Sequence, residues 1–172
     1  MTFPLLKKYS FQPRLDMCVS TCLKIVCDNQ FDDAISIRQF NLWCNYEGKS
    51  GGGIAIDRLK EYLYPKLIQK RIVYNDKENV NIDFLYNLRK IGIYPIVIFH
   101  LRDYNEWKKK GGIQVLGDDE PNYHNLIVVD IDKDKQKILL FDTMYDKYRK
   151  KENDEDIYDE ISYHDLYKYW AQ

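Results

Sequence analysis

Cys18 and His124 carry the most distinctive chemistry in this sequence, because a thiol beside an imidazole can act as a nucleophile. A cysteine attacks a carbonyl carbon efficiently when the pKa of its thiol is lowered. The start of a helix and a neighbouring histidine lower that pKa through the helix dipole and a positive charge. We expect a helix to begin near Cys18 and a strand to begin near His124. The two residues are therefore predicted to be a nucleophile and its base.

Asp142 and Gln12 extend this pair to four positions. Asp142 ends the strand that is predicted to pair with the His124 strand, so its carboxylate can orient the imidazole and stabilise the protonated ring. Gln12 stands six residues before Cys18. Its side-chain amide and the backbone N–H of Cys18 are predicted oxyanion donors. Taken alone, Cys18 is better interpreted as a buried structural thiol, but the ordered set of four favours catalysis.

The elements that must position these residues follow an order of helices first and strands afterwards. This order predicts an α+β fold in which an N-terminal helical half, carrying the nucleophile helix, packs on an antiparallel sheet carrying His124 and Asp142. The length of 172 residues fits one domain, residues 1–172. The predicted helices are 17–28, 33–46, 54–64, 81–91 and 162–170, the predicted strands are 67–74, 93–99, 125–131 and 137–141, and 48–53, 101–123 and 150–160 are predicted loops.

Composition and cysteine spacing argue against several other classes of function. A formal net charge of −1 gives no basic excess for binding nucleic acid. The basic run from Lys108 to Lys110 is interpreted as solvated loop charge. The four cysteines have no secretory context, so we expect reduced thiols rather than disulfides. They also lack zinc-ligand spacing, so we expect no metal and no cofactor. With no visible signal peptide and no apolar run near the roughly 20 residues that span a bilayer, we expect a cytoplasmic protein without membrane contact.

Three segments resemble the papain-like cysteine peptidases. They are Gln12-Pro-Arg-Leu-Asp-Met-Cys18, Tyr123-His124-Asn-Leu-Ile-Val-Val-Asp-Ile and Leu139-Leu-Phe-Asp142-Thr. With the glycine-rich 48–53 segment, the 92–99 segment and the closing 162–170 segment, their order and spacing are similar to those of the double-glycine (bacteriocin-processing) peptidases and their stand-alone relatives. The resemblance covers almost the whole chain. It implies that Gln12 contributes to an oxyanion hole, Cys18 attacks a carbonyl, His124 is base and then acid, and Asp142 orients His124.

The resemblance implies a cysteine peptidase that cleaves a peptide or isopeptide bond in a peptide or protein substrate through an acyl-enzyme intermediate. Two alternatives stay open from the residues. The same residues could transfer the acyl group to an amine or deamidate a glutamine, because a thioester also forms from a side-chain amide. Val19 occupies a position where the family usually has a small residue. That departure leaves open an inactive relative that only binds peptides.

Overall fold

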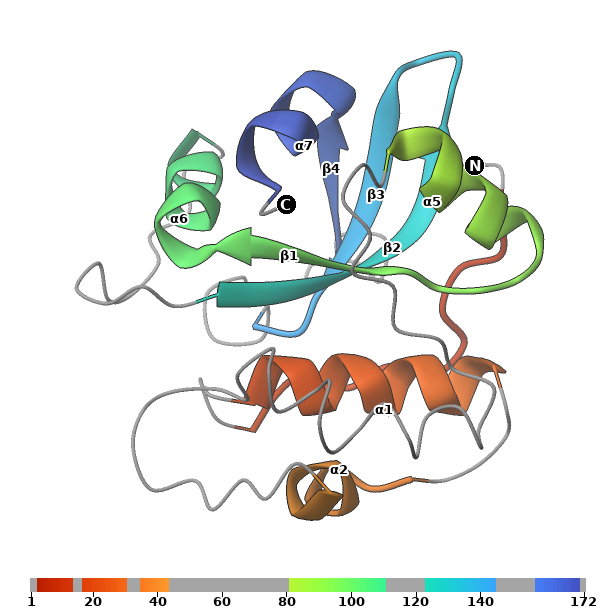
Figure 1. Ribbon diagram of the computed structural model, residues 1–172, viewed down its shortest axis with the longest axis vertical. Coiled ribbons are helices and arrows are strands. Elements are labelled where there is room, and N and C mark those ends of the chain that lie inside the picture. The colour runs from red at the N-terminus through yellow and green to blue at the C-terminus, as the bar shows by residue number, and fades with distance from the viewer. Residues whose placement is uncertain are drawn as a thin grey trace.

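A four-stranded antiparallel sheet with the order β1-β2-β3-β4 forms the centre of the fold (Figure 1). The computed structural model describes residues 3–13, 17–30, 35–43, 81–110, 123–144 and 157–170. Its strands are β1 (Ile96–His100), β2 (Tyr123–Asp132), β3 (Lys137–Asp142) and β4 (Tyr158–Ser162). The predicted β2–β3 hairpin is confirmed, since the two strands pair from Leu126 opposite Asp142 to Asp132 opposite Lys137.

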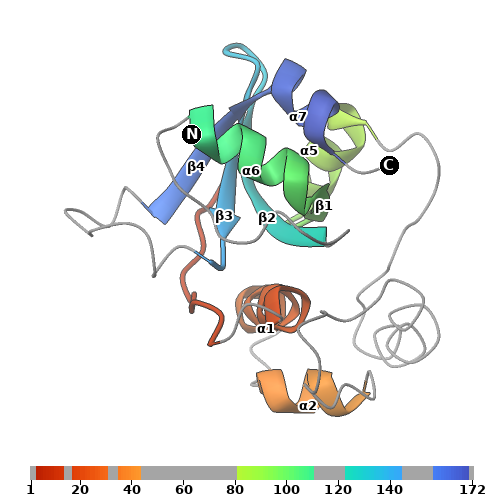
Figure 2. The same ribbon diagram turned by 90° about the vertical axis from the view of Figure 1, so that its left-hand side faces the viewer.

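Helices cover both faces of this sheet. On one face lies α1 (Cys18–Gln30), with α2 (Ile37–Trp43) beyond it on the side away from the sheet (Figure 2). On the other face lie α5 (Ile82–Lys90), α6 (Leu101–Lys110) and α7 (Tyr163–Tyr169). The α+β prediction is therefore confirmed in its main feature, N-terminal helices packed on an antiparallel sheet. The additional layer formed by α5, α6 and α7 makes the sheet a central layer rather than one half of the molecule.

Two clusters of buried apolar side chains hold the three layers together, one on each face of the sheet. Because helices cover both faces, β2 is buried at eight consecutive positions instead of at alternate ones. The cluster on the α1 face contains Leu6, Cys22, Ile25, Val26, Tyr94, Ile127, Val129, Phe141 and Ile157. The cluster on the other face contains Ile82, Leu85, Val97, Phe99, Tyr104, Leu126, Val128, Ile131, Ile138, Leu140, Ile161, Leu166 and Tyr169.

Local capping signals explain where two of these helices begin and one ends. The side chain of Asn81 accepts a hydrogen bond from the backbone N–H of Phe84 and caps α5. Gly92 ends that helix with a φ of +83°, a left-handed conformation that favours glycine. Ser162 caps α7 in the same way as Asn81, by accepting from the N–H of Asp165. The helices predicted at 81–91 and 162–170 are confirmed to within a residue or so at each end.

Two loop predictions are wrong. The segment 101–123 was expected to be irregular, but its first ten residues form α6. Lys108, interpreted above as solvated loop charge, lies on this helix and is buried. The segment 150–160 was expected to be a charged loop, but the fourth strand begins within it at Tyr158. In both cases tertiary contacts bury polar side chains that a sequence pattern assigns to solvent.

Other predicted elements are shorter than expected or lie outside the described residues. The helix predicted at 33–46 is described as α2 over 37–43 only, and the strand predicted at 93–99 is β1 over 96–100. The glycine-rich loop at 48–53, the helix at 54–64 and the strand at 67–74 all lie outside the part of the chain that the structure describes. They stay predictions.

Candidate active site

The predicted nucleophile is the first residue of α1. Cys18 begins this helix as expected, and its side chain is buried, with 4% of the residue exposed. The free N–H groups at a helix start carry a partial positive charge, which favours a thiolate there. Val19, the next residue, is also buried. Cys22, one turn further along α1, is fully buried in the core, and burial raises the pKa of its thiol well above the usual value.

Strand pairing brings His124 and Asp142 together. Leu126 of β2 is directly opposite Asp142 of β3, and His124 stands two residues before Leu126, so all three side chains share one face of the sheet. The Nε2 atom of His124 lies 2.8 Å from Oδ1 of Asp142. Both side chains are 2% exposed. Asp142 therefore occupies the position expected of a residue that orients the imidazole.

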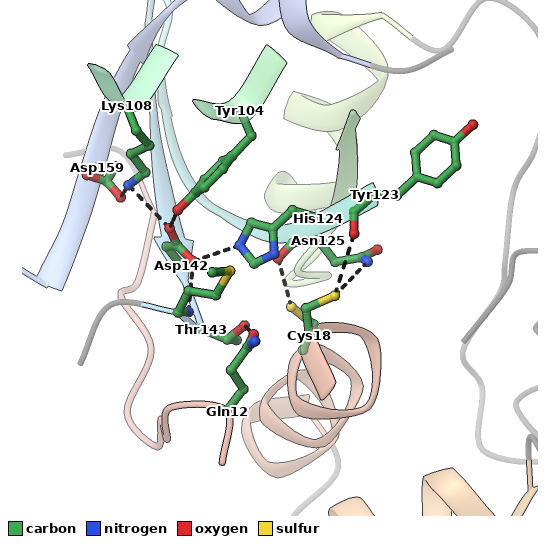
Figure 3. Close-up of polar contacts among 12 residues, drawn as sticks. Gln12, Cys18, Tyr104, Lys108, Tyr123, His124, Asn125, Asp142, Thr143 and Asp159 are labelled. Atoms are coloured by element: carbon green, nitrogen blue, oxygen red, sulfur yellow. Dashed lines mark hydrogen bonds and ion pairs between the residues drawn. The ribbon is translucent and has the colours of Figure 1, made fainter. Parts of the chain in front are cut away.

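The neighbouring residue, Asn125, reaches the thiol from the opposite face of β2. Its Nδ2 atom donates a hydrogen bond to Sγ of Cys18 over 3.3 Å, and its backbone oxygen lies 3.4 Å from Sγ of Cys22. The carbonyl oxygen of Tyr123 lies 4.0 Å from Sγ of Cys18. Figure 3 shows His124 between Asp142 and Cys18, with Asn125 on the far side of the sulfur. Sequence reasoning missed Asn125, although it directly follows the predicted base.

The electrostatics of the site favour a charged pair of thiolate and imidazolium. Burial alone raises the pKa of the Cys18 thiol, but the hydrogen bond and charge of His124 and the hydrogen bonds of Asn125 lower it below its ordinary value. Burial alone lowers the pKa of His124, but the charge and hydrogen bond of Asp142 and contact with Cys18 raise it to about 9. Each partner thus stabilises the ionised form of the other.

Four donors surround the Asp142 carboxylate. Its Oδ1 atom accepts from His124 and, over 2.8 Å, from the backbone N–H of Met144. Its Oδ2 atom accepts from the hydroxyl of Tyr104 and lies 3.2 Å from Nζ of Lys108. Burial raises the pKa of this carboxyl, but the charges of His124 and Lys108 and the hydrogen bonds of His124 and Tyr104 hold it well below the usual range. Asp142 is therefore an ionised, fixed partner for the imidazole.

Gln12 is tied to the residue that follows Asp142. Its backbone N–H donates to the carbonyl of Thr143 over 2.9 Å, and the Thr143 hydroxyl donates to Oε1 of Gln12 over 2.6 Å. With the oxygen held by Thr143, the amide nitrogen of Gln12 lies on the side of the Cys18 helix (Figure 3). The structure thus brings all four predicted site residues to one end of the sheet.

The other two histidines and Trp107 take no part in the hydrogen bonds described above. His100 ends β1, and its ring lies against that of Tyr123, with centroids 4.6 Å apart. His164 is exposed on α7. Trp107 packs its ring against Phe99 and Tyr104 in the core.

The chain matches no protein-family model and no curated protein. In the described parts of the chain, no helix has the length and apolar character needed to cross a membrane. Within the same residues, no group of three or more His, Cys, Asp and Glu side chains is arranged to hold a metal ion.

Proposed function

We propose that this chain is a papain-like cysteine peptidase that cleaves a peptide or isopeptide bond. Cys18 is the nucleophile, His124 is its base and acid, and Asp142 orients His124. Gln12 and the backbone N–H of Cys18 hold the oxyanion. The observation that carries the proposal is the contact of His124 with Asp142 at 2.8 Å, together with a lowered Cys18 pKa at the start of α1.

The arrangement supports the following sequence of steps. The Cys18 thiolate attacks the substrate carbonyl carbon, and the electron pair of the C=O bond moves to oxygen, where Gln12 donates a hydrogen bond. The His124 imidazolium gives its proton to the leaving amine as the C–N bond breaks, which leaves a thioester on Cys18. His124 then takes a proton from water. The resulting hydroxide attacks the thioester carbonyl, the C–S bond breaks, and the acid product leaves the Cys18 thiolate paired with the His124 imidazolium.

Three features of the geometry support this assignment of roles. Asp142 binds Nε2 of His124, so the ring is held with its other nitrogen available for the thiol and the substrate. Asp142 remains ionised throughout, because four donors satisfy its oxygens. Thr143 fixes the Gln12 amide before any substrate arrives, which is the preorganisation that oxyanion stabilisation requires.

The function is tested by incubating the protein and its Cys18→Ala variant with a peptide library and a cell extract, followed by mass spectrometry. We expect new peptide termini that depend on Cys18, and an acylated Cys18 peptide in short incubations. A mass gain of about one unit on glutamine without cleavage would show that the reaction is deamidation rather than peptide-bond hydrolysis. Crosslinked products would show that it is acyl transfer. If the wild type and Cys18→Ala bind the same partners equally and neither yields any product, the proposed enzymatic function is refuted.

A further inference from the structure

A buried ion pair lies directly behind the Asp142 carboxylate. Lys108 of α6 and Asp159 of β4 are 4% and 6% exposed, and Nζ of Lys108 donates to Oδ2 of Asp159. The same Nζ lies 3.2 Å from Oδ2 of Asp142. Removing two charges from water costs several kcal/mol per ion. A protein with apolar residues of similar size in place of a buried ion pair is often at least as stable. Stability alone is therefore a weak explanation for a buried lysine between two aspartates.

The charges alternate along one connected path. It runs from the Cys18 thiolate through the His124 imidazolium, the Asp142 carboxylate and the Lys108 ammonium to the Asp159 carboxylate. Figure 3 shows these side chains following one another from α1 across the end of the sheet to α6 and β4. Each charge is adjacent to charges of the opposite sign, so a change at one end alters the field at the other, because a protein interior screens charges weakly.

We propose that Lys108 and Asp159 form a positioning pair that fixes the Asp142 carboxylate and sets how strongly it stabilises the His124 imidazolium. Lys108 holds one Asp142 oxygen, which leaves the other directed at His124, and it offsets part of the Asp142 charge. Asp159 in turn offsets part of the Lys108 charge. The pair touches no substrate and acts only through Asp142. This inference rests on the proposed function of the Cys18–His124 pair.

Other titratable groups contact this path and are part of the same environment. The Tyr104 ring of α6 meets the His124 ring edge-on at 4.6 Å, and its hydroxyl donates to Asp142. Lys108 also lies over the Tyr104 ring, at 5.4 Å from its centroid. On the α1 side the path meets the thiols of Cys18 and Cys22. Tyr104 and both thiols stay unchanged in the variants below, so differences between variants report the two charges that are altered.

The two charges predict shifts of opposite sign. Removing the Lys108 cation makes the field at the site more negative, which favours a protonated His124 and disfavours the Cys18 thiolate. Both groups then titrate at higher pH. Removing the Asp159 anion has the opposite effect, so both groups titrate at lower pH. If Lys108 and Asp159 had only a packing role, their replacement would not shift the two titrations in opposite directions according to the charge removed.

The test compares the wild type, Asp159→Asn and the double variant Lys108→Met/Asp159→Asn. The single Lys108→Met variant leaves Asp159 buried without its cation and is therefore the one most exposed to unfolding. The two Asp159→Asn proteins differ only at Lys108. Two readouts are used, the pH dependence of Cys18 alkylation by iodoacetamide and the pH titration of the His124 ring by NMR. Thermal denaturation checks the fold. Lys168→Met, which removes a lysine paired with Glu106 on the surface, is the control.

We expect Asp159→Asn to titrate below the wild type and the double variant to titrate above Asp159→Asn by about half a pH unit or more, in both readouts. The control should titrate with the wild type. If the folded variants have the same Cys18 and His124 titrations as the wild type, and Cys18 of the wild type still reacts at low pH, the positioning pair is refuted and the proposed function stands. If Cys18 of the wild type titrates like an ordinary thiol, the proposed function fails, and the His124 titration alone then decides for or against the pair.

Discussion

His124 and Asp142 form a hydrogen-bonded pair 2.8 Å apart in which both side chains are almost completely removed from solvent. Burial by itself makes an imidazolium and a carboxylate unfavourable, so their ionised forms depend on each other and on neighbouring donors. This dependence links the fold to the chemistry. A change in either residue alters both the stability of the protein and the ionisation of Cys18.

Replacing Asp142 by asparagine should lower the pKa of His124 from about 9 toward its ordinary value, because the carboxylate charge that raises it is lost. Turnover should fall by about 10²–10⁴-fold, since the imidazolium is no longer stabilised. The His124 titration followed by NMR, with steady-state rates on an identified peptide, measures both effects. Asp83→Asn, which removes an exposed carboxylate paired with Lys133, is the matched control. An unchanged His124 titration in Asp142→Asn would refute the pairing.

The same pair should make stability depend on pH. The folded pKa of His124 is raised above the unfolded 6.5, so its contribution is complete below pH 6.5 and is lost as the pH rises through about 9. The pKa of Asp142 is lowered, so its contribution is complete above pH 3.8 and is lost as the pH falls below that value. The loss on the alkaline side should reach about 1–3 kcal/mol.

Urea unfolding between pH 5 and pH 9 measures this loss, in a Cys18→Ala background so that ionisation of the nucleophile does not contribute. His124→Gln in the same background should flatten the alkaline decline, because the titrating group is gone. Equal declines in both proteins would show that another group is responsible.

Asn125 should stabilise the thiolate directly, since its Nδ2 atom donates to Sγ of Cys18. We expect Asn125→Leu to raise the pKa of the thiol and to slow alkylation of Cys18 at pH 6 by about tenfold. Asn125→Asp should slow it further, because it places a carboxylate beside the sulfur. Alkylation rates at pH 6 and pH 10 separate this effect from access, which would change the rate equally at both values.

Thr143 should act on catalysis through Gln12. Thr143→Val removes the hydroxyl that donates to Oε1 of Gln12, so the oxyanion donor is no longer held in place. We expect kcat to fall by about tenfold with little change in KM, while Gln12→Ala lowers kcat by about 10²–10³-fold. Thr143→Ser keeps the hydroxyl and should retain most of the rate.

The combination of the two substitutions is the stricter test. If Thr143 works only by orienting Gln12, Thr143→Val in the Gln12→Ala background should have almost no additional effect. Additive losses would show that Thr143 has a separate role.

The sequence was sufficient to predict where Cys18, His124 and Asp142 lie in the fold, because their positions depend on local signals. Cys18 opens an apolar helical pattern, while His124 and Asp142 sit at the ends of two strands whose alternation and connecting turn define their pairing. The starts of α5 and α7 are set by equally local signals, the side-chain caps of Asn81 and Ser162.

The supporting residues could not be read in this way because their roles depend on contacts distant in sequence. Tyr104, Trp107 and Lys108 do share one side of α6 at helical spacing, a signal that the polar composition of 101–110 concealed. In β4, the buried positions are Asp159 and Ile161, so an aspartate takes a place where a strand pattern expects an apolar residue. The ion pair with the Lys108 ammonium explains why Asp159 is tolerated there. Charges of this kind look like surface residues in sequence.

The pH dependence of Cys18 alkylation, compared between the wild type and His124→Ala, is the most direct measurement. Because only 4% of Cys18 is exposed, the probe must be as small as iodoacetamide, with modification located by mass spectrometry. A paired thiolate predicts that the Cys18 thiol of the wild type titrates below pH 9.0, its ordinary pKa, and that His124→Ala shifts the titration upward. Identical titrations near pH 9 in both proteins would contradict an activated nucleophile.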